Sequence, residues 1–185
     1  MGEHSVRNAL AAIAVAVAAK IPLSTIEEGL SKFRPVSGRL NVESVAGVDV
    51  IDDTYNANPA SMRAAINVLA QSDDNTLIVG DMAELGSATE VEHKALGAQA
   101  AKRGVKRLLA CGKYADLVVG AFGSNGIAFS TQEELLEHLN SQQSLQVLGD
   151  TILVKGSRSA RMERVVELLH KKIGGEASHD VRGEH

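Results

Sequence analysis

The sequence predicts an α/β fold, a mostly parallel sheet with helices on both faces, preceded by a short helical segment. Four short apolar runs, each followed by a helical pattern, give the alternation typical of parallel sheets with crossover helices. Several of these helices also carry start signals of their own. With 185 residues, 44% hydrophobic and 23% charged, the chain can bury one ordinary core without disulfides or metals.

The chain begins with a stretch that predicts two helices, over residues 5–20 and 24–33. The first contains strong helix formers and little polar face, so we expect it to pack on several sides until Ile21-Pro22 ends it. Its apolar part covers only eleven residues, 9–19, whereas a bilayer crossing needs about 20. Ser24-Thr25-Ile26-Glu27 has the spacing of a capping box, which predicts the start of the second helix.

Residues 36–173 are expected to form the main domain, which opens with a hairpin. Alternating valines around Ala46-Gly47 predict two antiparallel strands that lead into Asp52-Asp53. Four more strands are expected, each before a helical pattern, at 76–79, 107–111, 127–129 and 151–154. The polar, aperiodic residues 174–185 are expected to form a disordered tail.

Three helix starts are predicted from short motifs inside this domain. Asn58-Pro59 combines an N-cap residue with a proline, which the first helical position tolerates. Ser87-Ala88-Thr89-Glu90 and Ser130-Thr131-Gln132-Glu133 both have the spacing of a capping box. Each motif lies after an expected strand, as an alternating α/β chain requires.

Charge and cysteine usage exclude several classes of protein. The net charge is -4 and the 19 lysines and arginines are scattered, so no surface for nucleic acid or for an anionic membrane is expected. The one cysteine, Cys111, has no partner for an internal disulfide, which favours a cytoplasmic location. None of the six histidines has metal-ligand spacing, and no Walker-type phosphate loop or nucleophile motif occurs. No metal site is therefore expected in this chain.

The loops that follow the expected strands are polar, and in an open α/β sheet ligands bind beyond the carboxyl ends of the strands. Asp53 can accept hydrogen bonds from vicinal hydroxyls such as those of a ribose, or it can simply help turn the chain. Asp81 and Glu84 can bind an ammonium group or a metal, or they can serve as helix-start carboxylates. Sequence spacing alone leaves both alternatives open.

Two further groups of residues also have a functional and a structural interpretation. Lys155-Gly156-Ser157-Arg158 offers two cations, a hydroxyl and a flexible backbone, which suit a carboxylate or a phosphate. A plain turn from strand to helix is an equal alternative. His4 and Asn8 lie four residues apart on one helix face, so they can converge on a planar ligand such as a base, or belong to a helix cap.

Five motifs occur together and in order along the chain. They are Gly2-x-His4-x-x-x-Asn8, Gly38-Arg39, Asp53-x-Tyr55-x-Ala57-Asn58-Pro59, Gly80-Asp81-Met82-x-Glu84-Leu85-Gly86, and Lys155-Gly156-Ser157-Arg158 with Met162-Glu163. This set resembles the Mur ligases from residue 2 to about residue 172. The fourth and fifth motifs are most similar to the branch that adds D-alanyl-D-alanine. The Asp-Asn-Pro-Arg motif of the diaminopimelate-adding branch is missing.

The resemblance implies an enzyme of three domains, of which this chain holds a part. Residues 1–35 would be the last helices of the central ATPase domain, and residues 36–173 the C-terminal Rossmann-like domain. The implied activity is ATP-dependent ligation of D-alanyl-D-alanine to UDP-N-acetylmuramoyl-tripeptide through an acyl phosphate, a step of peptidoglycan precursor synthesis. ATP and Mg²⁺ are the implied cofactors, with the metal ligands outside this chain. The chain alone is expected to fold without ligating.

The resemblance also implies roles for individual residues. The nucleotide-binding residues would be His4, Asn8, Arg39, Asp53, Tyr55 and Asn58. The residues that face the incoming dipeptide and the acyl phosphate would be Asp81, Glu84, Lys155, Ser157 and Arg158. No residue is identified as a general base. The alternatives are a non-catalytic Rossmann-like module that binds a nucleotide or a peptide, and a purely structural domain.

Overall fold

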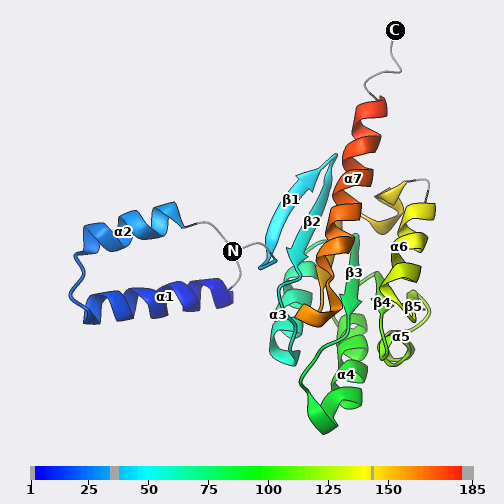
Figure 1. Cartoon of the computed structure of the whole chain (residues 1–185), viewed down its shortest axis with the longest axis horizontal. Coiled ribbons are helices and arrows are strands. Elements are labelled where there is room, and N and C mark those ends of the chain that lie inside the picture. The colour runs from blue at the N-terminus through cyan, green and yellow to red at the C-terminus, as the bar shows by residue number, and fades with distance from the viewer. Residues whose placement is uncertain (1–2, 34–37, 143, 181–185) are drawn as a thin grey trace. The chain divides into compact units, whose positions relative to one another are not determined.

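The computed structural model describes residues 3–33, 38–142 and 144–180, without the side chains of residues 3–5, 146 and 174–180. The chain divides into two compact units, residues 1–36 and 37–185. The first unit contains the helices α1 (Glu3–Ala18) and α2 (Leu23–Lys32), which contact each other. The second contains a six-stranded sheet and the remaining helices (Figure 1).

The first unit confirms the two expected helices but not their expected surroundings. Within residues 6–33 no residue is buried, so α1 does not pack on several sides here. The physical reason is that a pair of helices can cover only one side of each member. The predicted capping box is also wrong, because Pro22 occupies the N-cap position of α2 and no side chain caps it.

The second unit confirms the expected α/β architecture. Its sheet has the order β1-β2-β6-β3-β4-β5, and every neighbouring pair is parallel except the hairpin β1-β2. Ala46 and Gly47 both have positive φ at the hairpin turn, which matches the twist of the two strands. The strands are β1 (Asn41–Val45), β2 (Val48–Asp53), β3 (Asn75–Gly80), β4 (Arg107–Cys111), β5 (Gly126–Phe129) and β6 (Thr151–Lys155).

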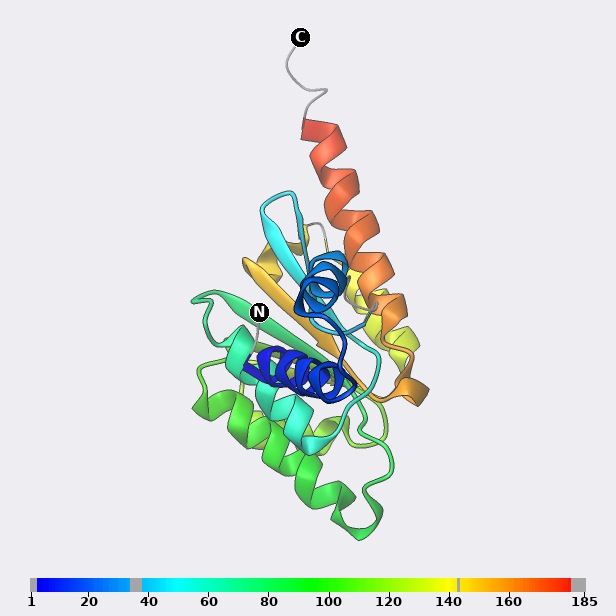
Figure 2. The same cartoon turned by 90° about the vertical axis from the view of Figure 1, so that its left-hand side faces the viewer.

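Helices cover both faces of this sheet, as the strand pattern predicts. They are α3 (Pro59–Leu69), α4 (Thr89–Lys102), α5 (Ala115–Phe122), α6 (Gln132–Ser141) and α7 (Glu163–Asp180). Figure 2 shows α7 along one face and α3 and α4 along the other. Alternate residues of each strand supply the two cores, so Ile78 packs with α6 and α7 while Leu77 and Val79 pack with α3, α4 and α5.

The three predicted helix starts have different outcomes. Asn58 caps α3 as predicted, and its side-chain oxygen accepts a hydrogen bond from the Ser61 amide. The predicted box at Ser87 is wrong, because Ser87 lies in a short 3₁₀ helix and Ala88 precedes α4 without a side-chain cap. At α6 the cap is Thr131, one residue later than predicted, and it accepts from the Glu134 amide.

The expected disordered tail needs correction, because α7 continues to Asp180. Extending an established helix adds about one hydrogen bond per residue fixed, so polar and glycine residues can follow a packed helical segment. Residues 181–185 of the expected tail lie outside the described residues. Among the described residues, no helix is both long and apolar enough to cross a membrane.

Candidate functional site

The carboxyl ends of four parallel strands meet at one edge of the sheet, as the sequence predicts. Asp53, the last residue of β2, is paired in register with Lys155, the last residue of β6. Lys155 lies beside Val79 of β3, and Gly80 of β3 lies beside Cys111 of β4. The loops after β2, β6, β3 and β4 therefore begin side by side, and we call this region the carboxyl edge.

At the carboxyl edge, Lys155 and Asp53 form a buried ion pair. The Lys155 ammonium donates to Asp53 Oδ2 at 2.5 Å and to the carbonyl oxygen of Asn56 at 2.9 Å. The Lys155 side chain is 2% exposed and the Asp53 side chain 13%. A buried ammonium is tolerated only when such partners replace its hydration. Lys155 thus fastens the loop after β2, whereas the sequence suggested a cation facing the substrate.

The two carboxylates at the end of β2 also hold the segment that precedes β1. Asp52 Oδ2 accepts a hydrogen bond from the Gly38 amide, and Asp53 Oδ1 accepts one from the Leu40 amide. The Tyr55 amide in turn donates to the Gly38 carbonyl. A Cβ at Gly38 would lie 2.8 Å from the Tyr55 nitrogen, so only glycine permits this approach.

This arrangement brings three of the predicted nucleotide-binding residues together. The Arg39 guanidinium lies 4.4 Å from the centre of the Tyr55 ring, a cation–π geometry. Both side chains are exposed, next to the Asp53 loop. A flat cationic surface beside a carboxylate suits a phosphorylated sugar. Asn58, in contrast, uses its side-chain oxygen to cap α3.

Asp81 lies directly after β3, and its carboxylate is occupied by the next loop along the sheet. Asp81 Oδ2 accepts a hydrogen bond from the Lys113 amide at 2.9 Å, and Oδ1 accepts one from the Tyr114 amide at 3.2 Å. These amides lie just before α5, where a helix favours negative charge. A Cβ at Gly112 would lie 2.5 Å from Asp81 Oδ2 and would prevent this contact. Asp81 therefore joins the loops after β3 and β4.

The loops after β3 and β6 are joined as well. The Ser157 amide donates to the Asp81 carbonyl at 3.0 Å. A Cβ at Gly80 or at Gly156 would lie within 2.9 Å of atoms of Ala160 or Met162. The two glycines allow the loops to meet over the start of α7. Ser157 itself is buried, and its hydroxyl lies 3.0 Å from that of Ser159.

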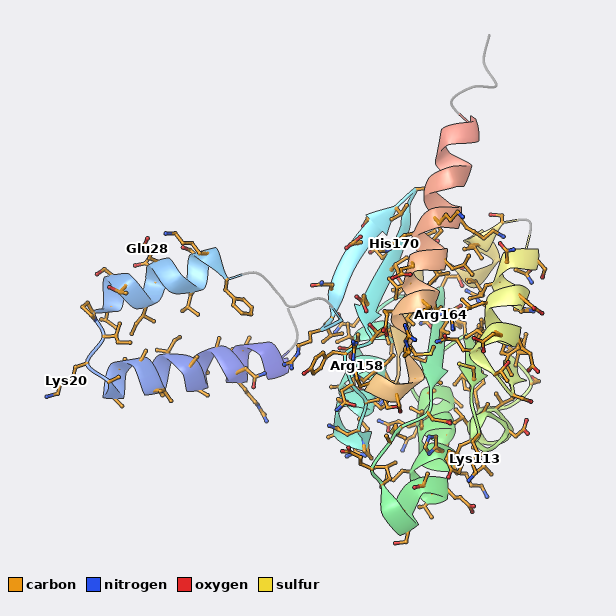
Figure 3. All side chains as sticks on the ribbon, viewed as in Figure 1. Lys20, Glu28, Lys113, Arg158, Arg164 and His170 are labelled. Carbon is orange, nitrogen blue, oxygen red and sulfur yellow. The ribbon has the colours of Figure 1, made fainter. Side chains whose placement is uncertain are left out.

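Glu84 and Arg158 are the predicted substrate residues that remain open to solvent. Glu84 is exposed and has a φ of 62°, in the left-handed region. Arg158 is 70% exposed, and its Nη1 lies 3.7 Å from Glu163 Oε1. Figure 3 shows Arg158 near the beginning of α7 and Lys113 in the loop after β4. Such an exposed guanidinium can receive a carboxylate in two parallel hydrogen bonds.

The sequence analysis missed two residues that hold these loops. His93 of α4 is buried, and its Nε2 accepts a hydrogen bond from the Met82 amide at 3.0 Å. Gln132 at the start of α6 donates to the carbonyls of Ala160 and Arg161 after β6. Helical spacing places His93 on the inner face of α4, but only the fold shows its partner.

Other candidate groups have a more limited outcome. His4 and Asn8 belong to the first unit; Asn8 is exposed, and the side chain of His4 lies outside the described residues. Their convergence on a base stays a prediction.

Cys111 is buried, which raises the pKa of its thiol to about 12, with a smaller contribution from Asp81. In the described part of the chain, no three His, Cys, Asp or Glu side chains gather as metal ligands would.

Comparison with known proteins identifies relatives that match more than nine tenths of the chain. The family model for the Mur ligase, glutamate ligase domain, matches residues 38–158. The UDP-N-acetylmuramoyl-tripeptide--D-alanyl-D-alanine ligase of Escherichia coli K12 is 40% identical over 172 residues, which cover 92% of this chain and 38% of that protein. The ligase of the same name from Bacillus subtilis is 33% identical, over 91% of this chain and 38% of its own. The chain thus spans about two fifths of these relatives.

Solved structures give the same result. MurF from Acinetobacter baumannii has a TM-score of 0.81 and 38% identity, and the match covers 93% of this chain and 38% of that one. MurF from Thermotoga maritima, solved in complex with ADP, has a TM-score of 0.65 and 28% identity over 78% of this chain and 33% of its own. The match of residues 38–158 to the family model shows that the chain belongs to the Mur ligase family.

Proposed function

We propose that this chain is the C-terminal, dipeptide-binding part of the ATP-dependent ligase that joins D-alanyl-D-alanine to UDP-N-acetylmuramoyl-tripeptide. The observation that carries the proposal is similarity over more than nine tenths of the chain to ligases named for this reaction. Residues 1–35 would then complete a central ATPase domain. The reaction belongs to peptidoglycan precursor synthesis in the cytoplasm, and no nucleic acid or membrane takes part in it.

In the proposed reaction, ATP transfers its γ-phosphoryl group to the terminal carboxylate of the tripeptide and leaves as ADP. The amine of D-alanyl-D-alanine attacks the resulting acyl phosphate and gives up a proton, and the tetrahedral intermediate collapses to a peptide bond with loss of phosphate. Phosphoryl transfer depends on a phosphate-binding loop and on a metal ion. We assign the phosphate-binding loop and the ligands of the metal ion, Mg²⁺, to parts of the ligase outside this chain.

The nucleotide side of the site is proposed at the loop after β2. Arg39 and Tyr55 form an exposed cationic surface, and Asp53 is held beside them by Lys155. The Asp53 oxygens already accept from the Leu40 amide and from Lys155, but each oxygen of a carboxylate has two lone pairs, so Asp53 can also accept hydrogen bonds from the ribose hydroxyls. The Thermotoga relative was solved with ADP, which supports a nucleotide as the ligand. The side-chain amide nitrogen of Asn58 would add a contact to ATP at this loop. His4 and Asn8 of the first unit are further proposed contacts to ATP.

The dipeptide side is proposed at the loops after β3 and β6. D-alanyl-D-alanine carries an ammonium group and a carboxylate, so its site needs one anionic and one cationic partner. Glu84 and Arg158 are exposed and of opposite charge, on loops that the Asp81 carbonyl and the Ser157 amide join. Asp81, Ser157 and Lys155 would then act by holding this frame, since their polar atoms already have partners in the fold.

An NMR titration of the ¹⁵N-labelled chain tests the proposal directly. D-alanyl-D-alanine should shift the amides of residues 82–86 and 157–160, and ADP those of residues 38–40 and 53–58. L-alanyl-L-alanine is the matched control and should bind at least about tenfold more weakly, because reversed methyl positions lose packing and polar contacts. Shifts with ADP alone would favour a nucleotide-binding module, and the absence of both would favour a structural domain.

A chimera tests the catalytic part of the proposal. The chain would replace the matching C-terminal part of the 40% identical Escherichia coli ligase. The chimera should release phosphate only when ATP, Mg²⁺, the UDP-linked tripeptide and D-alanyl-D-alanine are all present. The chain alone should release none above background, since its sequence has no Walker-type phosphate loop. Turnover by the chain alone would contradict its assignment as one part of the enzyme.

A further inference from the structure

His93 lies where three elements of the second unit meet. It belongs to α4, and its side chain is 1% exposed. Its ring contacts the loop after β3 through Met82, and it stacks against Tyr114 at the start of α5 with 4.7 Å between ring centres. A polar side chain buried to this extent needs partners for both ring nitrogens.

The hydrogen bonds determine the protonation state of the ring. The Met82 amide can only donate, so Nε2 of His93 accepts from it and carries no proton. Nδ1 lies 2.7 Å from the Thr89 carbonyl, which can only accept, so Nδ1 carries the proton. His93 is therefore a neutral imidazole. Asp81 Oδ1, at 3.8 Å from Nε2, is accordingly not its ion-pair partner and instead takes the Tyr114 amide.

These contacts fix the beginning of the loop after β3 on several sides. The Asp81 carboxylate is held by the start of α5, its carbonyl by the Ser157 amide, and the next amide, that of Met82, by His93. Beyond Met82 the loop becomes exposed, and Glu84 follows two residues later in the left-handed region. The direction in which Glu84 leaves the fold thus depends on the Met82 anchor.

We propose that His93 is a positioning residue for the D-alanyl-D-alanine site. By accepting the Met82 hydrogen bond, the neutral ring holds the loop so that the Glu84 carboxylate meets the ammonium group of the dipeptide. The inference rests on the proposed function. It gives a role to a residue that does not itself contact the substrate. His93 acts through the loop and does not take part in the nucleotide site.

Two substitutions of similar size distinguish the role of Nε2 from that of Nδ1. Glutamine places an amide oxygen about as far from the backbone as Nε2, so His93→Gln can still accept from Met82. Asparagine reaches only as far as Nδ1, so His93→Asn can keep the bond to the Thr89 carbonyl but leaves the Met82 amide unpaired. Both variants remove the ring and its stacking on Tyr114, and thermal unfolding shows whether their stabilities match.

The first readout is independent of any ligand. In the ¹⁵N-labelled chain, Nδ1 of His93 should carry the proton, and hydrogen exchange of the Met82 amide should be slow. In His93→Gln the Met82 amide should keep this protection. In His93→Asn it should exchange at least about tenfold faster, because a buried donor would be unpaired. A proton on Nε2, or equal exchange of the Met82 amide in the two variants, would contradict the hydrogen bond from the Met82 amide to His93.

The second readout is binding by the same chain. The Kd for D-alanyl-D-alanine should rise about tenfold in His93→Asn and stay near the parent value in His93→Gln, while the Kd for ADP stays the same in both. Equal dipeptide affinity in parent and His93→Asn would overturn the positioning role. A parent chain that binds no dipeptide would instead refute the dipeptide site of the proposed function, while exchange at Met82 would still report the anchor.

Discussion

Similar apolar side chains are exposed in the first unit of the chain and buried in the second. In the first unit, Leu10 and Val15 of α1 are 59% and 70% exposed, although they lie in an apolar stretch. In the second unit, Leu153 of β6 is fully buried, and even the charged Lys155 is 2% exposed. An apolar side chain leaves water only where the fold supplies a surface to cover it. Burial in this protein is therefore decided by the number of packed layers, and hydropathy alone does not predict it.

The largest expected effect comes from removing the charge of Lys155. Lys155→Met keeps the volume of the side chain but leaves Asp53 partly buried without its cation and the Asn56 carbonyl without its donor. Breaking a buried ion pair costs about 3–5 kcal/mol. Urea unfolding followed by circular dichroism should show this loss in the free energy of unfolding. The double variant Lys155→Met/Asp53→Asn should recover part of it; no recovery would mean that the pair interacts weakly.

A cavity in the second core should have the next largest effect and a direct counterpart in the first unit. Leu153→Ala removes a fully buried side chain from the central strand β6, which typically costs about 2–5 kcal/mol. Leu10→Ala in α1 should change the free energy of unfolding by less than about 0.5 kcal/mol, because Leu10 is exposed and alanine favours helix. Similar losses for both substitutions, measured by urea unfolding, would contradict the contrast between the units.

Gly112→Ala tests a smaller effect at the carboxyl edge. Gly112 has a φ of 122°, and an added Cβ would meet the Asp81 carboxylate. The strain and the disturbed contacts with Lys113 and Tyr114 should cost about 1–3 kcal/mol. Gly120→Ala in α5 is the control, since nothing lies within 4 Å of its added Cβ, and it should be neutral or slightly stabilising. Differential scanning calorimetry of the two variants would compare them, and an unchanged Gly112→Ala would refute the close approach of Asp81.

The smallest expected change in stability comes from deleting residues 1–36. Both hydrophobic cores of the second unit consist of its own residues, so this unit should keep its Tm to within about 2 °C. Self-association should fall, because exposed apolar residues such as Leu10 and Val15 would be removed. Sedimentation velocity measures the association and calorimetry the Tm. A large drop in Tm would show that the two units stabilise each other.

The sequence by itself determined the fold class, the strand positions and the edge at which the proposed site lies. Strand patterns, helix starts and their order are local properties, and parallel strands with polar loops bring their carboxyl ends together. Asn58-Pro59 predicts a cap from two adjacent residues, and the partner that the structure gives Asn58, the Ser61 amide, is only three residues away. The boxes at Ser24 and Ser87 failed, since spacing does not determine whether a residue adopts the backbone conformation of a cap.

Only the tertiary structure decided which polar residues at this edge hold the fold and which face solvent. Lys155 meets Asp53 across 102 positions of the chain, and Asp81 meets the Lys113 amide across 32. His93 finds the Met82 amide because α4 packs beneath the loop after β3. The sequence around a carboxylate, an ammonium or an imidazole group does not show whether its partner will be a ligand or a distant backbone group. Burial decides between them, because a polar group withdrawn from water must find its hydrogen bonds within the folded chain.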